Sequence, residues 1–488
     1  QNTLSATGLV SRRAGHMDVL TENNLGGTSQ RNSTLVGDIR GWSYDASLAF
    51  RRVVAPQRNE ITAEVRFNDS VNDDLQNFNE QAYNASGTPT GSPFVRRDQR
   101  DNHTQTATAQ LDVIRPVSGF KVETGLKGTL RTLRDDLDAQ TSVNGTLQDD
   151  LVRSLDNGYE EQVYAGYVQA SRKMGKFSFQ AGVRLEQALT DLTNRRTNTT
   201  TENDYFSYFP SAFVNYAPSP ARQFKLTYSK RVNRPPIFML SSVPQYLDQY
   251  NIRVGNPQLK PEYTHSFEAG FNAFAPGRTL SVTPFFRRTV NAFRPRIEYD
   301  QATNVTTQTI RNFDKNDSYG LEVVGTLRPS QKANLSLTGN ASRIVTDGGN
   351  VEANLTNRTF MAMLQGNATY TVRPGTDLQL TAMYRSPVKF EQFRSSGMLM
   401  TNLALQQKLL RDKATLGLRV ADPLGIVRNH YRGQIEALDV VQEGDRRFQS
   451  RAAFLTFTYN FGKPPRQRPT PVRQTGEQQP DNTGGVGF

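Results

Sequence analysis

The sequence contains no cysteine, one tryptophan and no long run of apolar residues. Without cysteine the chain has no disulfides, no thiol chemistry and no thiolate metal site. The four histidines (His16, His103, His265 and His430) lie far apart and lack metal-ligand spacing. No stretch approaches the apolar length of a transmembrane helix, so a helical membrane protein is excluded.

The composition is poor in apolar residues but rich in aromatic ones. Hydrophobic residues make up 36% of the chain and the mean hydropathy is −0.61. Soluble globular chains are usually about 45–50% apolar. Yet the 27 phenylalanines and 18 tyrosines are too many for a disordered chain. This combination favours a structure with one apolar face and one wet face.

The net charge of +12 has two interpretations. It can reflect solvated loops and a wet interior, or an anionic partner such as nucleic acid or lipopolysaccharide. The basic residues are spread along the chain and form no single cluster. This spread favours the first interpretation, and we expect no nucleic-acid partner.

Apolar and polar residues alternate with a period of two almost everywhere, which predicts β-strands. The pattern is clear in "FSFQAGVRL", "QFKLTYSK", "NLSLTGNAS", "DLQLTAMY" and "FLTFTYNF". We predict about eighteen strands. They begin near Leu4, Ile39, Asn59, His103, Gly119, Gly158, Lys176, Asp204, Arg222, Tyr263, Arg278, Val305, Lys332, Thr359, Thr376, Met398, Lys413 and Arg451.

The expected connections alternate between short turns and long polar loops. The long loops are predicted roughly at 14–36, 70–101, 134–156, 190–203, 233–260, 346–357, 386–397 and 422–447, with a smaller one near Asp300. Bacterial outer-membrane barrels have short turns on the periplasmic side and long loops outside. The pattern therefore predicts an up-and-down antiparallel sheet with two different ends.

These features predict an all-β fold, a transmembrane antiparallel up-and-down β-barrel over residues 1–462. A closed barrel pairs every backbone group and turns its apolar face to lipid. The Pro/Gln/Gly-rich segment 463–488 is predicted to be a disordered periplasmic tail. Because the chain begins at Gln1 without a signal peptide, we expect it to be mature or truncated at its N-terminus.

Several segments resemble the β-barrel region of TonB-dependent outer-membrane receptors, in particular the outer-membrane β-barrel family of Bacteroidetes-like bacteria. They are "YEEQVYAGYVQASRKMGKFSFQAGVRLE", "YFSYFPSAFVNYAPSPARQFKLTYSKRVNRP" and "VGNPQLKPEYTHSFEAGF". The family motif in the third segment comprises Gly255, Asn256, Pro257, Leu259, Pro261 and Glu262. The closing strand resembles an assembly signal formed by Leu455, Phe457, Tyr459 and Phe461.

The resemblance implies a 22-stranded barrel around a plugged lumen, of which this chain supplies the C-terminal majority. No plug and no TonB box are visible in the sequence. The implied partners are outer-membrane lipid, lipopolysaccharide, the barrel assembly machinery, the TonB complex through a plug on another segment, and a transported ligand of unknown identity. No cofactor is implied.

No arrangement of residues indicates an enzyme or a metal centre. "GTPTGSPF" lacks the lysine of a phosphate-binding P-loop. The oxygen-rich stretch "NDSVNDD", residues 68–74, is a weak candidate for a Ca²⁺-binding loop because it lacks EF-hand spacing.

Ligand-binding candidates lie in the proline-rich loop between two predicted strands. Aromatic rings offer stacking surfaces with polar tips, and arginines offer a fork for anionic groups. The candidates are Arg234, Tyr246, Tyr250, Arg253 and Asn256. The alternative is that these residues only pack the loop against its neighbours.

The sequence therefore predicts an outer-membrane TonB-dependent receptor that binds a ligand at its extracellular loops. The alternative is a non-energised pore or structural barrel, including a subunit of a larger outer-membrane complex.

Overall fold

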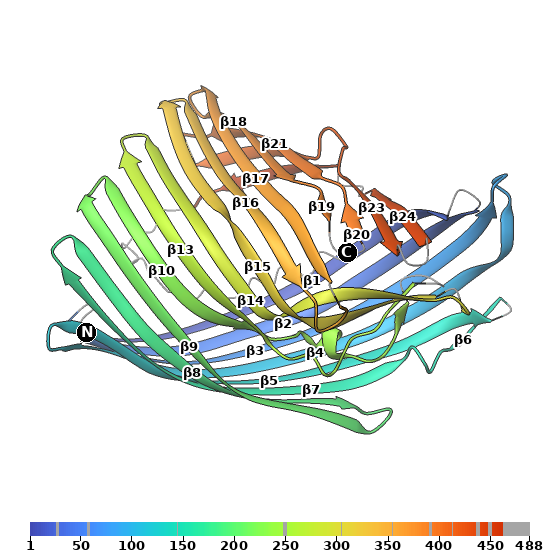
Figure 1. Ribbon diagram of the computed structural model, residues 1–488. Helices are drawn as coiled ribbons and strands as arrows, with labels where there is room; N and C mark the ends of the chain where they lie inside the picture. The colour runs from blue at the N-terminus through green and yellow to red at the C-terminus, as the bar shows by residue number, and fades with distance from the viewer. Residues whose placement is uncertain are drawn as a thin grey trace.

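The computed structural model describes residues 1–25, 29–55, 59–143, 145–246, 251–303, 305–353, 355–389, 393–411, 413–435, 440–447 and 451–461. Within them, nearly all residues belong to one large antiparallel sheet that curls on itself (Figure 1). No helix in this part of the chain is long and apolar enough to cross a membrane.

The wall of the sheet consists of long strands that pair one after another along the chain. They are β1 (Asn2–Leu25), β2 (Ser29–Ala55), β3 (Asn59–Asn84), β4 (Pro89–Val117), β5 (Phe120–Val143), β7 (Leu155–Met174), β8 (Phe177–Asn194), β9 (Thr199–Ser219), β10 (Arg222–Asn233), β13 (Glu262–Ala275), β14 (Arg278–Asp300), β15 (Val305–Ser330), β16 (Ala333–Asp347), β17 (Thr356–Arg373), β18 (Thr376–Arg385), β21 (Met398–Leu409), β22 (Ala414–Ala421) and β25 (Ala452–Tyr459).

The remaining described elements lie in the connections at the long-loop end. They are β6 (Thr146–Asp149), α1 (Ile237–Leu240), β11 (Gln245–Tyr246), β12 (Asn251–Arg253), β19 (Val388–Lys389), β20 (Phe393–Ser395), β23 (Arg428–Ile435) and β24 (Val440–Arg447).

The predicted all-β antiparallel architecture is confirmed, and each predicted strand start corresponds to one wall strand. Most starts agree within a few residues. Strands β2 and β4 begin well before the predicted Ile39 and His103. Polar residues there were interpreted as loop, but a strand that extends beyond the membrane can be polar on both faces.

The same reason makes several predicted long loops wrong. Residues 14–25 and 29–36, 70–101 and 190–203 lie mostly in extended hairpins rather than loops, in which β1 pairs with β2, β3 with β4 and β8 with β9. Residues 134–156 are also largely strand. Backbone hydrogen bonds hold the two strands of each hairpin together even where no apolar face is buried.

The weak candidate for a Ca²⁺-binding loop, residues 68–74, is not a loop. This stretch lies inside β3 and pairs with β2 and β4 on its two sides. Alternate strand residues point to opposite faces, so their carboxylates cannot converge on one ion. Asp69 instead accepts a hydrogen bond from His103 at 2.7 Å, across the β3–β4 pair.

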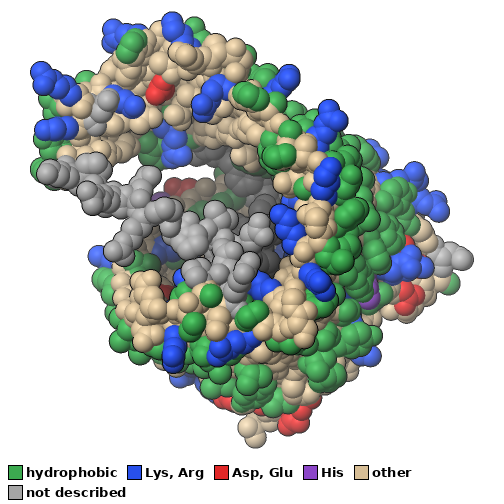
Figure 2. All heavy atoms as spheres, turned by 90° about the vertical axis from the view of Figure 1, so that its left-hand side faces the viewer, with side chains coloured by type: hydrophobic (Ala, Val, Ile, Leu, Met, Phe, Trp, Pro, Cys, Tyr) green, Lys and Arg blue, Asp and Glu red, His purple; other side chains and the backbone are tan. Residues whose placement is uncertain are grey.

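Apolar side chains cover the convex outer face of the wall. Leu48, Val65, Leu126 and Leu226 are each more than half exposed there. Figure 2, which faces the short-turn end, shows this apolar surface around the outside of a hollowed interior. The arrangement is that of a barrel whose apolar face meets lipid.

A row of aromatic rings crosses four neighbouring strands near the short-turn end. Phe177 stacks on Tyr216 at 4.6 Å between ring centres, Tyr216 stacks on Phe224 at 6.2 Å, and Phe224 contacts Phe271 in a tilted arrangement at 5.1 Å. These rings come from four successive wall strands, β8 to β13. Aromatic girdles of this kind mark the membrane interfaces of outer-membrane barrels.

The wall has two edges that are paired on one side only in the described structure. β25 pairs with β22, and residues 2–20 of β1 pair with β2. The outer end of β1 also pairs with β24, through Thr21–Asn24. An unpaired strand edge offers backbone groups to a further strand. The 22-stranded barrel, which would supply such strands, remains a prediction.

Trp42 allows a direct test of which face meets lipid. It is the only tryptophan, it points outward from β2 and 47% of its surface is exposed. We expect brominated phospholipids to quench its fluorescence strongly and aqueous acrylamide to quench it weakly, because indole rings settle at the membrane interface. The double variant W42F/S43W moves the ring to the inner face and should reverse the two sensitivities. Strong acrylamide quenching of the native protein would contradict the orientation.

Candidate functional site

The connection from β10 to β13, residues 234–261, crosses the concave side of the sheet. The Arg96 guanidinium on β4 donates to the carbonyl oxygen of Tyr246. Asn251 pairs with Thr306 on β15. Tyr246 also pairs with Ile252 of β12, which pairs with Thr307 of β15, whereas seven wall strands spaced about 4.8 Å apart separate β4 from β15 along the wall. The connection therefore bridges the two strands through the interior.

Arg234 fastens the beginning of this connection to the wall. Its Nη2 donates to Glu186 Oε2 on β8 at 2.6 Å, and its Nε donates to the hydroxyl of Tyr205 on β9 at 2.8 Å. Glu161 on β7 lies 3.9 Å from the same nitrogen. A hydrogen bond between charged groups contributes about 1.5–3 kcal/mol, so Arg234 is a strong anchor.

Two further arginines complete this charged cluster. Arg184 Nε donates to Glu186 Oε1 at 2.6 Å, and Arg131 Nη1 lies 3.3 Å from Glu161 Oε2. Glu186 is only 10% exposed and is thus shared between two guanidinium groups. Each buried carboxylate has a charged partner on the wall in addition to Arg234, as buried charges require.

A small apolar core holds the middle of the connection. Leu240 at the end of α1 and Leu259 pack with Tyr159 of β7 and Phe293 of β14. These four side chains are buried although they lie within an otherwise polar interior. The contact joins two strands that are far apart in the sheet order, and so the connection is a packed internal element.

The motif residues Gly255 and Asn256 turn back onto α1. Gly255 N donates to Ser241 O at 2.8 Å, and Asn256 N donates to Met239 O at 2.6 Å. A Cβ on Gly255 would lie 2.4 Å from the Ser241 oxygen, so only glycine fits at this close approach. The Asn256 side chain donates to Ile310 O on β15 at 3.2 Å.

The rest of the motif closes the connection. A turn runs from Asn256 to Leu259, with Pro257 at its second position, where proline is favoured. Pro261 is buried, and Glu262 accepts hydrogen bonds from Asn233 Nδ2 at 2.8 Å and Phe293 N at 2.9 Å. The motif therefore has a clear structural role in fixing the connection to β10, β14 and β15.

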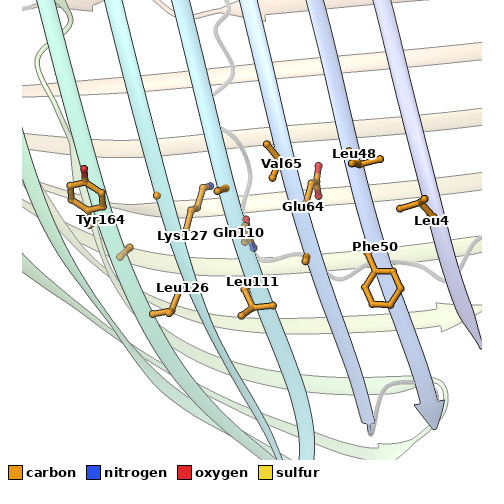
Figure 3. Close-up of a pocket in the computed structure, with 14 residues that line it drawn as sticks. Leu4, Leu48, Phe50, Glu64, Val65, Gln110, Leu111, Leu126, Lys127 and Tyr164 are labelled. Atoms are coloured by element: carbon orange, nitrogen blue, oxygen red, sulfur yellow. The ribbon is translucent and has the colours of Figure 1, made fainter.

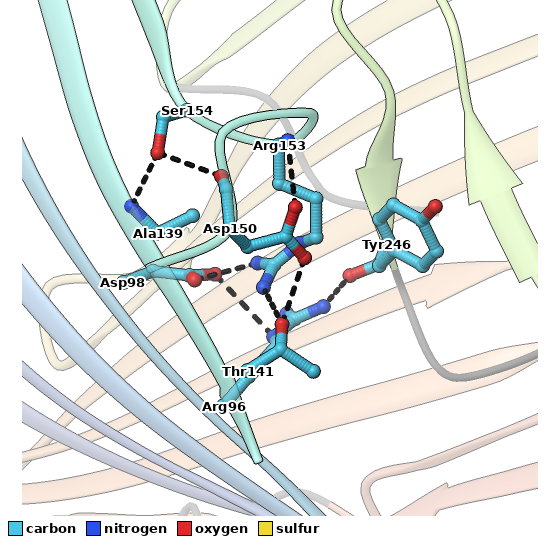
Figure 4. A network of polar contacts seen from close by, with 8 residues as sticks. All are labelled: Arg96, Asp98, Ala139, Thr141, Asp150, Arg153, Ser154 and Tyr246. Carbon is cyan, nitrogen blue, oxygen red and sulfur yellow. Dashed lines mark hydrogen bonds and ion pairs between the residues drawn. The ribbon is translucent and has the colours of Figure 1, made fainter. Parts of the chain in front are cut away.

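A second polar cluster holds Tyr246 against the opposite wall (Figure 4). Arg153, between β6 and β7, donates through Nη2 to Asp98 Oδ1 on β4 at 2.5 Å. Its guanidinium carbon lies 5.3 Å from the centre of the Tyr246 ring. Arg96 Nε lies 3.3 Å from the other Asp98 oxygen. One carboxylate thus positions two arginines that face the same tyrosine.

Hydrogen bonds also fix the β6–β7 connection that carries Arg153. Arg153 N and the Thr141 hydroxyl donate to the two Asp150 carboxylate oxygens at 3.2 and 2.9 Å. The Ser154 hydroxyl donates to Asp150 O at 2.8 Å and accepts from Ala139 N at 3.0 Å. Arg153 is therefore held in place before any contact with Tyr246.

The predicted ligand-binding residues do not form one group. Arg234 lies at the β7–β9 wall and Tyr246 near β4. Arg253 contacts Gln308 of β15 at 3.3 Å, and Asn256 lies beside Ile310. Tyr250 lies outside the described residues. Ligand binding by these side chains remains a prediction, although the described ones all have contacts within the protein.

Three of the predicted assembly-signal residues lie on the outward face of the last strand, and Phe461 follows its end. Leu455 is 74% exposed and Phe461 87% exposed, and Phe457 and Tyr459 share their face. Their place in assembly remains a prediction.

Sequence reasoning missed the partners that fix the connection. Glu161, Glu186 and Tyr205 lie in the segments that resemble the receptor family, where the sequence pattern assigns them no contact. Asp98 and Arg153 fell within predicted loops. The signal in the sequence was strand alternation. Residues an even number of positions apart share a face, and this places Glu161, Glu186 and Tyr205 on the inner face.

Comparisons with known proteins agree on the architecture. The sequence profile described as "Outer membrane protein beta-barrel family" matches residues 54–459. No curated protein matches the sequence. Among solved structures, the ferric yersiniabactin uptake receptor FyuA from Yersinia pestis is similar at 11% identity with a TM-score of 0.50, covering 91% of this chain and 80% of its own. The copper transporter OprC is similar at 10% identity with a TM-score of 0.53, covering 93% and 80%.

The Arg234 anchor can be tested by tryptic cleavage of the connection. In Arg234→Ala, Glu186 and Glu161 keep their wall arginines, so the barrel should fold while the connection loosens. We expect cleavage after Arg253 to be at least about fivefold faster, as loss of roughly 1 kcal/mol of local stability implies. Arg287→Ala, which removes a wall ion pair with Glu268, is the matched control. Equal cleavage in both variants would contradict the anchoring.

The close approach at Gly255 predicts a specific intolerance. Gly255→Ala should cost about 1–3 kcal/mol because the methyl group meets two carbonyl oxygens. The folded barrel band on electrophoresis should then be lost at a lower temperature. Gly15→Ala on β1, where a Cβ meets nothing within 4 Å, should leave that temperature unchanged. An unchanged melting of the Gly255 variant would refute the packing argument.

Proposed function

Because this chain belongs to the outer membrane protein beta-barrel family, which matches most of its length, we propose that it forms the barrel of a TonB-dependent receptor. Membership of the family places the chain in the bacterial outer membrane, among transport barrels and not enzymes. The proposal adds that a ligand binds at the long-loop end and is taken up with energy delivered from the periplasmic side.

The internal connection 234–261 carries this proposal. It crosses the concave side and is fixed by Arg234, by the apolar core around Leu240, and by Glu262. A barrel whose interior is crossed by a connection fixed to its wall is unsuited to free diffusion. Receptors of this kind admit a bound ligand only after a change in the lumen.

The similar solved structures support the same class of function. FyuA is an uptake receptor for ferric yersiniabactin and OprC is a copper transporter. We propose receptor-mediated uptake for this chain, without assigning either ligand to it. A ligand entering from the long-loop end would meet Tyr246 and Arg253 on the connection.

Energised uptake requires a plug and a TonB contact, which we propose lie outside the described segment of the barrel. Lipopolysaccharide around the outer leaflet and the barrel assembly machinery, acting on the last strand, are the other proposed partners. The tail 463–488 lies outside the described residues.

A non-energised pore or structural subunit is the second candidate. The one-sided edges of β1 and β25 favour it in one respect, since a partner barrel protein could pair there.

Two measurements on the full-length protein separate the candidates. A receptor should show no steady conductance in planar bilayers and should bind the C-terminal domain of the host's TonB in a pull-down assay. Steady conductance without TonB binding would overturn the receptor proposal and favour the pore. If the protein shows no steady conductance and does not bind TonB, that result would favour the structural subunit.

A further inference from the structure

The outer face of the wall carries an apolar trough of about 560 Å³ across β1 to β7 (Figure 3). Small residues form its floor: Ala63 on β3, Ala109 on β4 and Gly128 on β5. The register places Ala109 and Gly128 side by side between Val65 and Tyr164. Bulky neighbours thus enclose a shallow channel within the lipid-facing surface.

The walls of this trough are apolar side chains from successive strands. They are Leu4, Leu48, Phe50, Val65, Leu111, Leu126 and Tyr164. A Cβ added to Gly128 would meet only the Tyr164 ring, at 3.8 Å, so the floor is open space. A flexible hydrocarbon chain fits such a channel, because lipid tails are what surrounds the apolar face of a barrel.

Three arginines lie on the same outward face, between the trough and the short turns. Arg52 follows Phe50 by two residues, Arg115 follows Leu111 by four, and Arg172 follows Tyr164 by eight. Even separations in a strand keep side chains on one face. Each arginine lies two or three residues before the end of its strand, so all three lie at a similar distance from the short turns.

These arginines have no acidic partner among the described residues. Arg115 donates to the Asn59 side chain at 2.6 Å, and the Arg172 guanidinium carbon lies 5.1 Å from the centre of the Phe120 ring. Both contacts hold a guanidinium in place while leaving its charge uncompensated. Long basic side chains at the edge of an apolar surface place their charge at the headgroup level.

The arginines belong to a wider basic collar at the short-turn end, visible as Lys and Arg side chains around the opening in Figure 2. Its exposed members are Arg52, Arg115, Arg172, Lys173, Lys176, Arg222, Arg278, Arg328, Lys332, Arg373, Lys408, Arg411 and Lys413. The carboxylates close to the described short turns are Glu60, Glu123 and Asp377, and the first two pair with other basic residues.

We propose that the trough and Arg52, Arg115 and Arg172 together bind one anionic glycerophospholipid of the periplasmic leaflet. An acyl chain lies in the trough and the phosphate meets Arg115, with Arg52 and Arg172 on its two sides. The four residues from Leu111 to Arg115 span about 13 Å, close to the half-thickness of the hydrocarbon core, about 15 Å. Short turns of bacterial barrels face the periplasm, which assigns the leaflet.

Native mass spectrometry of the purified full-length protein with added palmitoyl-oleoyl phosphatidylglycerol tests this site. The triple variant R52Q/R115Q/R172Q should lose bound phosphatidylglycerol about tenfold or more, given the attraction of each basic residue to an anionic lipid surface. The matched control R222Q/R278Q/R328Q removes three collar arginines away from the trough and should keep the lipid. Equal loss in both variants would overturn the site in favour of diffuse attraction by the collar.

The trough is tested separately by filling it. Gly128→Leu should reduce lipid retention severalfold, whereas Gly325→Leu, on the outward face of β15 and with comparable free space, should not. The folded band on electrophoresis shows that each variant forms its barrel. Equal retention of phosphatidylcholine, preferential retention of a lipid A preparation, or no retention by the native protein would each overturn the proposal.

Discussion

The rest of this structure depends on one constraint, the continuous pairing of backbone groups around the wall. In lipid an unpaired N–H or C=O has no water to replace its partner. The chain satisfies this pairing constraint with long antiparallel strands, joined in order from β1 to β25. Because the pairing continues beyond the apolar belt, hairpins such as β3–β4 extend far past the membrane. The same continuity makes the edges of β1 and β25 conspicuous, since each has only one neighbour over most of its length.

Because the wall strands are held by pairing with one another, the interior side chains are free to make other contacts. The interior here is polar, and its carboxylates and guanidinium groups are arranged in pairs between adjacent strands. Arg234 uses two of these carboxylates, Glu186 and Glu161, which already have partners on the wall. The internal connection is thus attached to a rigid surface that does not depend on it. The connection can therefore move without unfolding the barrel.

The two faces of the wall also divide the protein's interactions. The inner face holds the internal connection, where we propose that the transported ligand binds. The outer face holds the apolar belt, the row of aromatic rings around Phe224 and the basic collar, which concern lipid. Strand alternation keeps the two sets independent, since neighbouring residues such as Arg51 and Arg52 face opposite sides. Arg51 pairs with Glu60 inside, whereas Arg52 has no described carboxylate partner outside.

The sequence by itself determined the fold class, the number of wall strands and the two kinds of connection, because a period of two and turn residues are local signals. It also located the motif from Gly255 to Glu262. It did not determine where the hairpins end, as at Asp69, because polar strands beyond the membrane look like loops. Only the tertiary structure decided that Arg234 meets Glu186, that Arg153 meets Asp98 and that the connection crosses the interior. These contacts join strands distant in sequence, and their partners are selected by the curvature of the sheet, which no local pattern encodes.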